Sequence, residues 1–427
     1  MNVLVVGSGG REHALAWAIA RSSGIEALHV APGNAGTAAL ARNADIAVTD
    51  IDALVAFARD HRVDLTVVGP EAPLNSGIVD RFRAEGLLCY GPAAAAARLE
   101  GSKAFAKEFM LRHGIPTAAF AVFDDAARAR AFARTLALPV VIKADGLAAG
   151  KGVIVATTLA EADRAIDGMI VERQFGDSGG RVVVEEFLTG EEVSIHAMCD
   201  GGSAVLLPSS QDHKRAFDGD TGPNTGGMGA IAPVPWVSEE DMRRAHATII
   251  QPVLDGMIAE GTPFTGTLYA GLMWTRSGPK VLEFNTRFGD PETEVLMPLL
   301  ADDAAALFLA AASGRLPQDV SVRPGSAASV VIASEGYPDR YRTGIPIEGL
   351  DAPAREGTIV FHAGTRRDTD GRVVTAGGRV LAVTGWAGDL GGALQAAYDG
   401  VARVRFDGGF CRTDIGRRHT DTRRSGN

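Results

Sequence analysis

Residues 280–294 read Lys280-Val-Leu-Glu-Phe-Asn-Thr-Arg-Phe-Gly-Asp-Pro-Glu-Thr-Glu294, and the first half of this stretch alternates apolar and polar side chains. Successive side chains of a β-strand point to opposite faces, so a strand here places Glu283, Asn285 and Arg287 on one face. The opposite face would then carry Leu282, Phe284 and Phe288. A carboxylate and an amide oxygen on one face suit a hard cation such as Mg²⁺, which also takes water and substrate phosphates as ligands. An ordinary amphipathic strand with a solvated face fits the same pattern, so the rest of the chain must decide.

The composition indicates a folded protein of several domains. The 427 residues are 46% hydrophobic with a net charge of −10, which suggests about two to four domains and, without a long basic run, argues against nucleic-acid binding. The three cysteines are far apart and form no CxxC pair, so we expect no disulfide framework and no zinc cluster. The N-terminus has no basic region and no cleavage site, so we expect no signal peptide. Two aspartates interrupt the apolar run near 296–312, so we expect no membrane span and a cytoplasmic location.

Residues 1–101 alternate short apolar strands with helices, which is typical of a parallel α/β sheet. The strands are expected at 3–6, 27–30, 65–68 and 87–90, and the helices at 12–21 and 51–59. The first strand leads into Gly7-Ser-Gly-Gly-Arg-Glu-His13, a loop whose backbone N–H groups could bind a phosphate at a helix N-terminus. Gly7, Gly9 and Gly10 are therefore candidate substrate contacts. Asn34 and Glu71 follow later strands and are expected at the same sheet edge, although Glu71 also fits an ordinary turn.

This loop departs from a dinucleotide fingerprint in two ways. The third glycine of GxGxxG would fall on Glu12, and the second strand ends in Val30-Ala-Pro-Gly-Asn34 without an acid for a ribose hydroxyl. Both departures disfavour a nicotinamide-dependent dehydrogenase and favour a phosphate site for a smaller ligand.

Lysines and glycines between residues 99 and 153 favour a polyphosphate site. Ser102 is expected to cap a helix that runs to Arg112, and Lys103 lies in its first turn, where the helix dipole disfavours a cation unless that cation holds an anion. The strand 139–143 ends in Lys143 and leads into a glycine-rich hairpin that contains Gly150 and Lys151. This hairpin could cover a polyphosphate, but its GxxxGKG spacing is not a P-loop, and a tight turn with exposed lysines is the alternative.

Two further segments carry candidate binding groups. A buried strand is expected at 181–188, where the backbone of 186–188 could contact a purine and Glu192 could accept ribose hydroxyls. Residues 211–215 and 222–229 are expected to form a long polar loop without secondary structure, and loops of this kind are usually functional or disordered. Its basic side chains could hold an anionic substrate, whereas His213 is expected to make a hydrogen bond within the loop rather than to bind a metal.

The residues after a boundary near 321–326 are expected to form a small α+β domain. Its expected strands are 328–333, 358–363, 379–384 and one near 403–406, with a helix at 390–401. The polar tail 417–427 is expected to fray.

Several of these stretches occur together in one order: GSGGREHA, APGN, GPE, LEGSKAF, VIKADGLAAGKGV, VEEFLTGEEVS, QDHKR, GPNTGGMGA, VLEFNTRFGDPETE, FHAGT, TAGGRVL and RTDIG. Together they resemble the phosphoribosylamine–glycine ligase family, ATP-grasp enzymes of purine biosynthesis that are also called glycinamide ribonucleotide synthetases. The resemblance extends from Gly7 to Gly416. Thr286 and Ile231 depart from it, since we expect cysteine and an aromatic residue there in many relatives.

The resemblance implies three domains with α/β and α+β folds. An N-terminal parallel α/β substrate domain would span 1–101, an ATP-grasp domain 102–324 with a mobile lid at about 117–187, and a C-terminal α+β domain 325–427. We expect a monomer, with a weak homodimer as the alternative.

The resemblance also implies the ligands and the site residues. The ligands would be ATP with Mg²⁺ or Mn²⁺, glycine and phosphoribosylamine, without nucleic acid or membrane. The ATP contacts would be Lys103, Lys143, Gly150, Lys151, Glu185, Glu186, Phe187, Leu188 and Glu192, and the metal ligands Glu283 and Asn285. Phosphoribosylamine would bind near Gly7, Gly9, Gly10, Asn34 and Glu71. Catalysis on the glycine side would involve Asp212, Lys214 and Arg287.

The implied chemistry agrees with the residue types. A carboxylate is a poor electrophile, so glycine would first be converted to glycyl phosphate and then attacked by the amine of phosphoribosylamine. Positioning and charge neutralisation by Mg²⁺, lysine and arginine suffice for phosphoryl transfer, and no nucleophilic serine or cysteine is needed. The rival functions are another ATP-grasp ligase, such as a carboxylase that acts on bicarbonate, and a non-catalytic nucleotide sensor. The set Lys103, Lys143, Glu283 and Asn285 disfavours the sensor.

Overall fold

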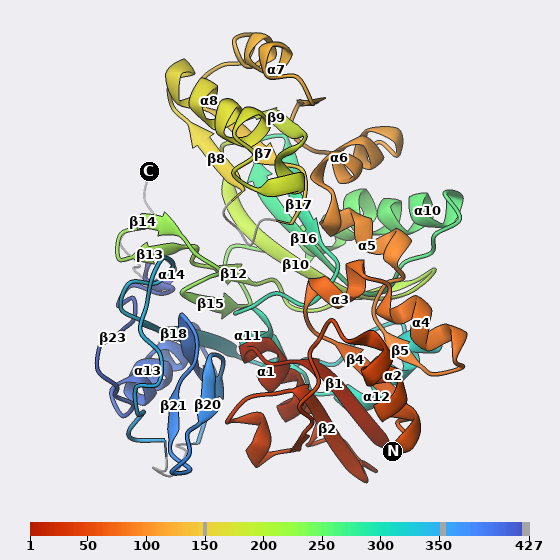
Figure 1. Ribbon diagram of the computed structural model, residues 1–427, viewed down its shortest axis with the longest axis vertical. Helices are drawn as coiled ribbons and strands as arrows, with labels where there is room; N and C mark the ends of the chain where they lie inside the picture. The colour runs from red at the N-terminus through yellow and green to blue at the C-terminus, as the bar shows by residue number, and fades with distance from the viewer. Residues whose placement is uncertain (148–151, 351–355, 421–427) are drawn as a thin grey trace.

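The computed structural model describes residues 1–147, 152–350 and 356–420. Its N-terminal part is a five-stranded parallel sheet in the order β3-β2-β1-β4-β5 (Figure 1). The strands are β1 (Asn2–Gly7), β2 (Ala27–Pro32), β3 (Arg42–Asn43), β4 (Leu65–Val68) and β5 (Cys89–Tyr90). The helices are α1 (Gly10–Ile19), α2 (Ile51–Asp60), α3 (Glu71–Asn75), α4 (Ile78–Ala84) and α5 (Ala94–Gly101). The predicted parallel α/β fold is confirmed, and the strand at 65–68 has the predicted bounds.

A separate antiparallel sheet forms the lobe at the top of Figure 1. Its order is β6 (Phe120–Phe123), β9 (Val182–Glu186), β7 (Val140–Ala144) and β8 (Val153–Ala156), and α7 (Ala126–Ala133) and α8 (Leu159–Ile166) pack against it. This lobe has its own hydrophobic core, which includes Ile142, Ala162 and Val184. A lobe with its own core can move as a unit, as the proposed lid must.

The third sheet contains the strand predicted to carry Glu283 and Asn285. Its order is β11 (Ala204–Leu206), β10 (Glu191–Asp200), β16 (Thr265–Thr275) and β17 (Gly278–Asn285). Helix α6 (Lys103–Arg112) precedes the upper lobe, and the Ser102 hydroxyl accepts a hydrogen bond from Phe105 N at 3.1 Å, so the predicted cap is confirmed. Helices α9 (Glu239–Ala245) and α10 (Gln251–Ala259) follow β15, and their apolar residues join the core that this sheet shares with α6.

The C-terminal sheet has six strands and draws on both sides of the boundary expected near residue 325. Its main order is β12 (Gln211–Asp212), β15 (Gly229–Ala232), β18 (Ser326–Ser334), β22 (Arg379–Ala387) and β19 (Thr358–His362). Helix α13 (Leu390–Val401) packs on β22 and β18 at its predicted bounds. The prediction of a strand near 403–406 is wrong. The last strand is β23 (Gly409–Phe410), which pairs with β18. The helices α11 (Thr293–Leu299) and α12 (Ala304–Ala312) join this sheet to the N-terminal one through a shared core.

The prediction of a loop without secondary structure at 211–215 and 222–229 is wrong. The segment 211–229 contains β12, a hairpin of β13 (Arg215–Phe217) and β14 (Thr221–Asn224), and the start of β15. Strands this short and polar carry no readable period-2 pattern, which is why the sequence predicted a loop. His213 does accept a hydrogen bond within the fold, from Gly416 N at 3.1 Å. Residues 417–420 of the tail form a short helix, α14 (Arg417–Thr420), and residues 421–427 lie outside the described residues.

In the described parts of the chain, no helix has the length and apolar character needed to cross a bilayer. The three cysteines are free thiols, as predicted.

Candidate active site

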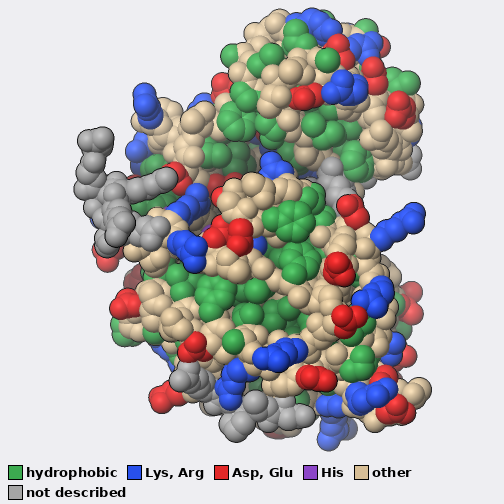
Figure 2. Space-filling model, turned by 90° about the vertical axis from the view of Figure 1, so that its left-hand side faces the viewer, with side chains coloured by type: hydrophobic (Ala, Val, Ile, Leu, Met, Phe, Trp, Pro, Cys, Tyr) green, Lys and Arg blue, Asp and Glu red, His purple; other side chains and the backbone are tan. Residues whose placement is uncertain are grey.

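A cleft of about 960 Å³ brings together most of the residues singled out from the sequence. It is visible as the hollow beneath the upper lobe in Figure 2. The predicted residues that line it are Glu71, Lys103, Lys143, Glu185, Glu186, Phe187, Leu188, Glu192, Asp212, Lys214, Glu283, Asn285 and Arg287. Gly150 and Lys151 lie outside the described residues, although Gly152 and Val153 of the same hairpin also line the cleft.

Strand β17 presents its polar side chains to this cleft. Glu283, Asn285 and Arg287 are half-buried at its wall, while Phe284 and Phe288 are buried, which confirms this part of the alternation. Leu282 departs from it. Gly271 pairs with Glu283 and Leu272 with Val281, so Leu282 is the extra residue of a β-bulge and borders the cleft.

The Glu283 carboxylate is surrounded by several positively charged side chains of the cleft. Burial opposes its ionisation, but Lys214, Lys143 and Lys103 outweigh burial and lower the pKa of Glu283 below 4.5. Asn285 Oδ1 lies on the same face and accepts a hydrogen bond from Arg287 at 3.3 Å. Among the residues that the structure describes, no group of three or more His, Cys, Asp or Glu side chains could hold a metal alone. These two oxygens therefore fit a divalent ion that takes its other ligands from water and phosphate, as Mg²⁺ does.

Lys143 and Lys107 share one buried carboxylate. Their ammonium groups each lie 2.5 Å from an oxygen of Glu185, and Lys143 also donates to Leu282 O at 2.9 Å. Burial lowers the pKa of Lys107 to about 8 despite the opposing effect of Glu185. Lys107 was missed in the sequence, because a lysine inside an amphipathic helix carries no signal of a partner 78 positions away in β9. Lys103 donates to Gly146 O at 3.2 Å, and its pKa is lowered by burial.

Asp212, Lys214 and Glu192 form a second charged group in the cleft. The Lys214 ammonium is in contact with the Glu192 carboxylate. Burial raises the pKa of Asp212 to about 8; Lys214 opposes this shift, and Glu292 and Glu192 add to it. Asp212 is thus a carboxyl group able to exchange a proton near neutral pH.

Arg287 is held by two carboxylates. It lies 3.0 Å from Glu100 and 3.5 Å from Glu71. Glu100, at the end of α5, also accepts a hydrogen bond from Thr286 N at 2.8 Å. Glu71 and Asn34 both follow parallel strands at the same edge of the sheet, but Glu71 lines the large cleft whereas Asn34 lines a different cavity.

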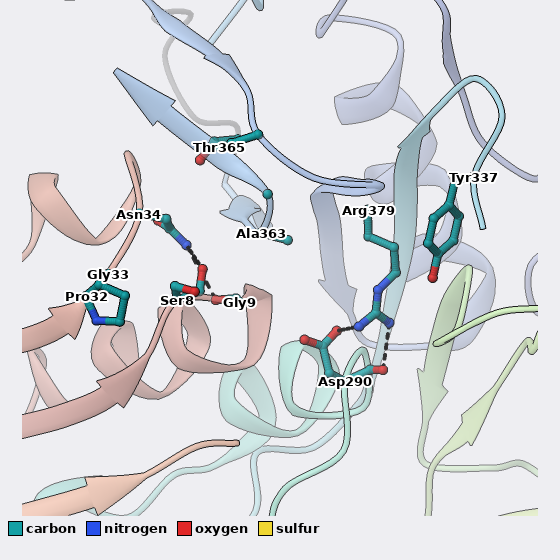
Figure 3. A pocket seen from close by; sticks show the side chains of 12 residues that line it. Ser8, Gly9, Pro32, Gly33, Asn34, Asp290, Tyr337, Ala363, Thr365 and Arg379 are labelled. Carbon is teal, nitrogen blue, oxygen red and sulfur yellow. Dashed lines mark hydrogen bonds and ion pairs between the residues drawn. The ribbon is translucent and has the colours of Figure 1, made fainter. Parts of the chain in front are cut away.

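A smaller cavity of about 390 Å³ lies where the N-terminal and C-terminal parts meet (Figure 3). Gly9 and Asn34 line it, together with Thr365. Asn34 donates to Ser8 O at 2.9 Å and to His362 O at 2.8 Å, so it ties the glycine loop to the C-terminal domain.

Gly7 and Gly10 do not line either cavity. Gly7 has a φ of 135°, and a Cβ there would meet Glu12 at 2.3 Å; a Cβ at Gly10 would meet Glu294 Oε1 at the same distance. These two glycines make room for buried carboxyl groups. The backbone donors expected to bind phosphate are also partly used, because Gly9 N donates to Glu12 at 2.6 Å and Arg11 N to Asp290 at 3.4 Å.

The ion pair of Arg379 and Asp290 separates the two cavities. Arg379 lies 3.0 Å from Asp290 Oδ1 (Figure 3). Both residues, with Tyr337, line both cavities. The sequence offered only a weak signal for this pair, since Arg379 opens a strand in TAGGRVL and Asp290 lies in a turn.

The fold defines the class of protein. The sheet β6-β9-β7-β8 and the sheet β11-β10-β16-β17 both contribute residues to the cleft, and the segment that contains them matches an ATP-grasp domain profile. A solved structure of similar fold is the biotin carboxylase domain of the Hydrogenobacter thermophilus 2-oxoglutarate carboxylase in complex with MgADP, with a TM-score of 0.76 and 17% identity over 96% of this chain and 91% of that chain. At this identity the likeness shows the fold alone.

Closer matches define the family. Family profiles for phosphoribosylglycinamide synthetase match as the N domain at 1–100, the ATP-grasp domain at 101–293 and the C domain at 327–418. A phosphoribosylamine–glycine ligase of Caulobacter vibrioides is 51% identical over 97% of this chain and 98% of its own length, and one of Escherichia coli is 53% identical over 97% and 98%. The crystal structure of the Thermotoga maritima ligase superposes with a TM-score of 0.86 at 36% identity, covering 97% of this chain and all of that chain. The chain belongs to the phosphoribosylglycinamide synthetase family, so the resemblance and the fold class predicted from the sequence are confirmed.

Proposed function

We propose that this chain joins glycine to 5-phosphoribosylamine at the expense of ATP, giving glycinamide ribonucleotide, ADP and phosphate. The observation that carries the proposal is the convergence of Lys103, Lys143, Lys214 and Glu283 in one cleft of a chain from this family. Curated relatives bear the name of this activity over almost the whole length of the chain.

ATP occupies the large cleft in this proposal. Lys103 and Lys143 neutralise its phosphates, and the predicted contacts of Gly150 and Lys151 lie outside the described residues. The adenine lies along residues 185–188, where the exposed Phe187 and the neighbouring Val141 offer apolar surface, and Glu192 accepts the ribose hydroxyls. A divalent cation, Mg²⁺ or Mn²⁺, would be held by Glu283 and Asn285 and would neutralise charge on the phosphates during transfer.

The charged groups beside Glu283 bind glycine and activate its carboxylate. An oxygen of the glycine carboxylate attacks the γ-phosphorus, the bond to the β-phosphate oxygen breaks, and ADP leaves. Arg287 and Lys214 hold the negative charge of the glycine carboxylate and of the transferred phosphoryl group. The product, glycyl phosphate, has phosphate as its leaving group.

The second step transfers the glycyl group to an amine. The nitrogen of phosphoribosylamine attacks the glycyl carbonyl, the bond to phosphate breaks, and the nitrogen loses a proton. Asp212 is suited to take that proton, because a base works best when its pKa lies near the operating pH. Closure of the lid would keep water from the acyl phosphate.

The small cavity would hold the sugar phosphate. Gly9 and Asn34 line it, and Arg379 supplies the positive charge that a 5-phosphate requires. Gly7 and Gly10 act indirectly by shaping the loop, and Glu71 acts by holding Arg287.

The test measures phosphate release from ATP with glycine and phosphoribosylamine together and with each omitted, and identifies the product by mass spectrometry. We expect full release only with both substrates, and a product of the mass of glycinamide ribonucleotide. Release that depends on bicarbonate instead, or no release under any condition, would refute the proposal. We also expect a monomer in the cytoplasm, which sedimentation and cell fractionation would check.

A further inference from the structure

The C-terminal clasp, which we define as Arg412, Thr413, Asp414 and Gly416, holds the β13–β14 hairpin. Arg412 is 2% exposed, although it carries a charge. Its guanidinium forms a fork with Asp414 at 2.7 and 2.9 Å, and it also donates to Asp220 at 2.8 Å and to Arg215 O at 3.2 Å. A buried guanidinium with this many partners fixes the groups around it, because leaving any of them unpaired is costly.

The clasp also binds the turn of the hairpin and the residue beside the cleft. Asp218 accepts a hydrogen bond from Thr413 N at 2.8 Å, and Gly219 N donates to Asp414 at 2.8 Å. At its other end, Gly416 N donates to His213 Nε2 at 3.1 Å. The clasp therefore contacts the segment 213–220 at both of its ends.

This segment sets the position of Lys214. Thr225 N, at the far end of the hairpin, donates to Lys214 O at 2.7 Å. The Lys214 side chain then reaches across the cleft wall to Glu192 in β10. The backbone of Lys214 is thus fixed between His213, which the clasp holds directly, and the hairpin, which the clasp holds through Asp218 and Asp220.

We propose that Arg412 and Asp218 are positioning residues for the ligation reaction, because the clasp they form holds Lys214 in the cleft. Neither residue lines either cavity, so both act through the hairpin. The inference deepens the proposed function and rests on it.

The test compares four full-length variants. Arg412→Met removes the guanidinium and keeps an apolar stem. Asp218→Ala removes the acceptor for Thr413 at an exposed position, so it tests the clasp even if Arg412→Met does not fold. Asp218→Asn keeps an oxygen acceptor and is the conservative rescue. Asp407→Ala is the control, because it breaks an exposed ion pair with Arg342 that involves none of the hairpin or clasp residues.

The measured quantity is kcat per ATP-binding site, with the number of sites taken from calorimetric titration. We expect this quantity to fall about 10- to 100-fold in Arg412→Met, since small misplacements of a catalytic group cost this much. We expect a smaller fall in Asp218→Ala, recovery in Asp218→Asn, and no change in Asp407→Ala. A merely structural role would lower the number of sites and leave kcat per site unchanged, and that result would overturn the proposal. Equal activities of Asp218→Ala and Asp218→Asn would also overturn it.

A second readout does not depend on the reaction. We expect the amides of residues 214–225 to exchange hydrogen faster in Asp218→Ala than in the wild type and in Asp407→Ala. Unchanged exchange would show that the clasp does not hold the hairpin. If the wild type itself showed no phosphate release dependent on both substrates, the proposed function would fail, and the exchange result would still report on the clasp.

Discussion

Replacing Glu283 with glutamine should weaken the binding of metal-bound ATP without weakening the binding of metal-free ATP. The substitution keeps the size of the side chain and removes its charge. Glu283 lies among Lys214, Lys143 and Lys103, which lower its pKa in spite of its burial, so the wild-type side chain is ionised at neutral pH. Without it, the cleft becomes more positive by one charge. Metal-free ATP should then bind as well as or better than before, whereas the divalent cation loses the one charged protein ligand of the proposed site.

The size of the loss can be estimated from one charge pair. Two opposite charges at contact distance in a partly solvated site interact by about 4 kcal/mol. Glu283 is half-buried, so we take about 2 to 4 kcal/mol, which corresponds to a ~30- to 1000-fold rise in the Mg²⁺ concentration at half-maximal activity. The fold should survive, because glutamine fills the same space in β17.

The assay titrates Mg²⁺ at saturating ATP and, separately, titrates ATP calorimetrically in the presence of a chelator. Glu191→Gln is the matched control, since Glu191 also lines the cleft but is 58% exposed and lies 3.4 Å from Arg418. We expect the control to leave both measurements unchanged. The reasoning is refuted if Glu283→Gln leaves the Mg²⁺ requirement unchanged, or if it weakens metal-free ATP as much as it weakens the metal complex.

Three further predictions concern single side chains. Lys143→Met should weaken ATP binding about tenfold or more. Lys107→Met, which removes the other lysine from the same buried carboxylate, should weaken ATP binding less. Equal losses of affinity in a calorimetric titration would contradict the role of Lys143 in binding the phosphates. Gly10→Ala should lower the free energy of unfolding by about 1 to 3 kcal/mol, because its Cβ would lie 2.3 Å from Glu294 Oε1; unchanged urea unfolding would contradict this. Burial lowers the pKa of His13 from 6.5 to about 3, so its contribution to stability is complete above about pH 6.5 and is lost as the pH falls towards 3, at up to about 1.4 kcal/mol per pH unit. His13→Gln should reduce the slope of the free energy of unfolding against pH between pH 7 and pH 5. An unaltered slope would refute the assignment.

Local signals predicted the parts of the fold that depend on neighbours in sequence. The Ser102 cap and the helix at 390–401 were found because a cap or a helical period is contained within a few residues. The polar face of Glu283 and Asn285 was found from the period of two. Leu282 was misplaced because a bulge depends on the register with β16, which the strand's own sequence does not reveal.

Long-range partners could not be read in the same way. The pairing of Lys107 with Glu185 joins α6 to the lid, and the pairing of Glu100 with Arg287 joins α5 to the end of β17. Nothing in either local pattern indicates which acid meets which base. The strands β12 and β15 were missed for a related reason, since their membership of the C-terminal sheet depends on β18, about a hundred positions further along the chain.

The charged side chains of the cleft are paired with one another in a way that bears on how ATP is recognised. Lys143 shares Glu185 with Lys107, Lys214 contacts Glu192, and Arg287 lies between Glu100 and Glu71. Such pairs hold the cations in place before binding, so less side-chain entropy is lost when a ligand arrives. They also reduce the net positive charge of the cleft, so an anion of low charge gains little from entering it. A ligand that carries several negative charges together with a divalent cation can satisfy the lysines, the arginine and the Glu283 carboxylate at once. The paired network thereby favours a metal-bound triphosphate over a simple phosphate, which is the discrimination that an ATP-dependent ligase requires.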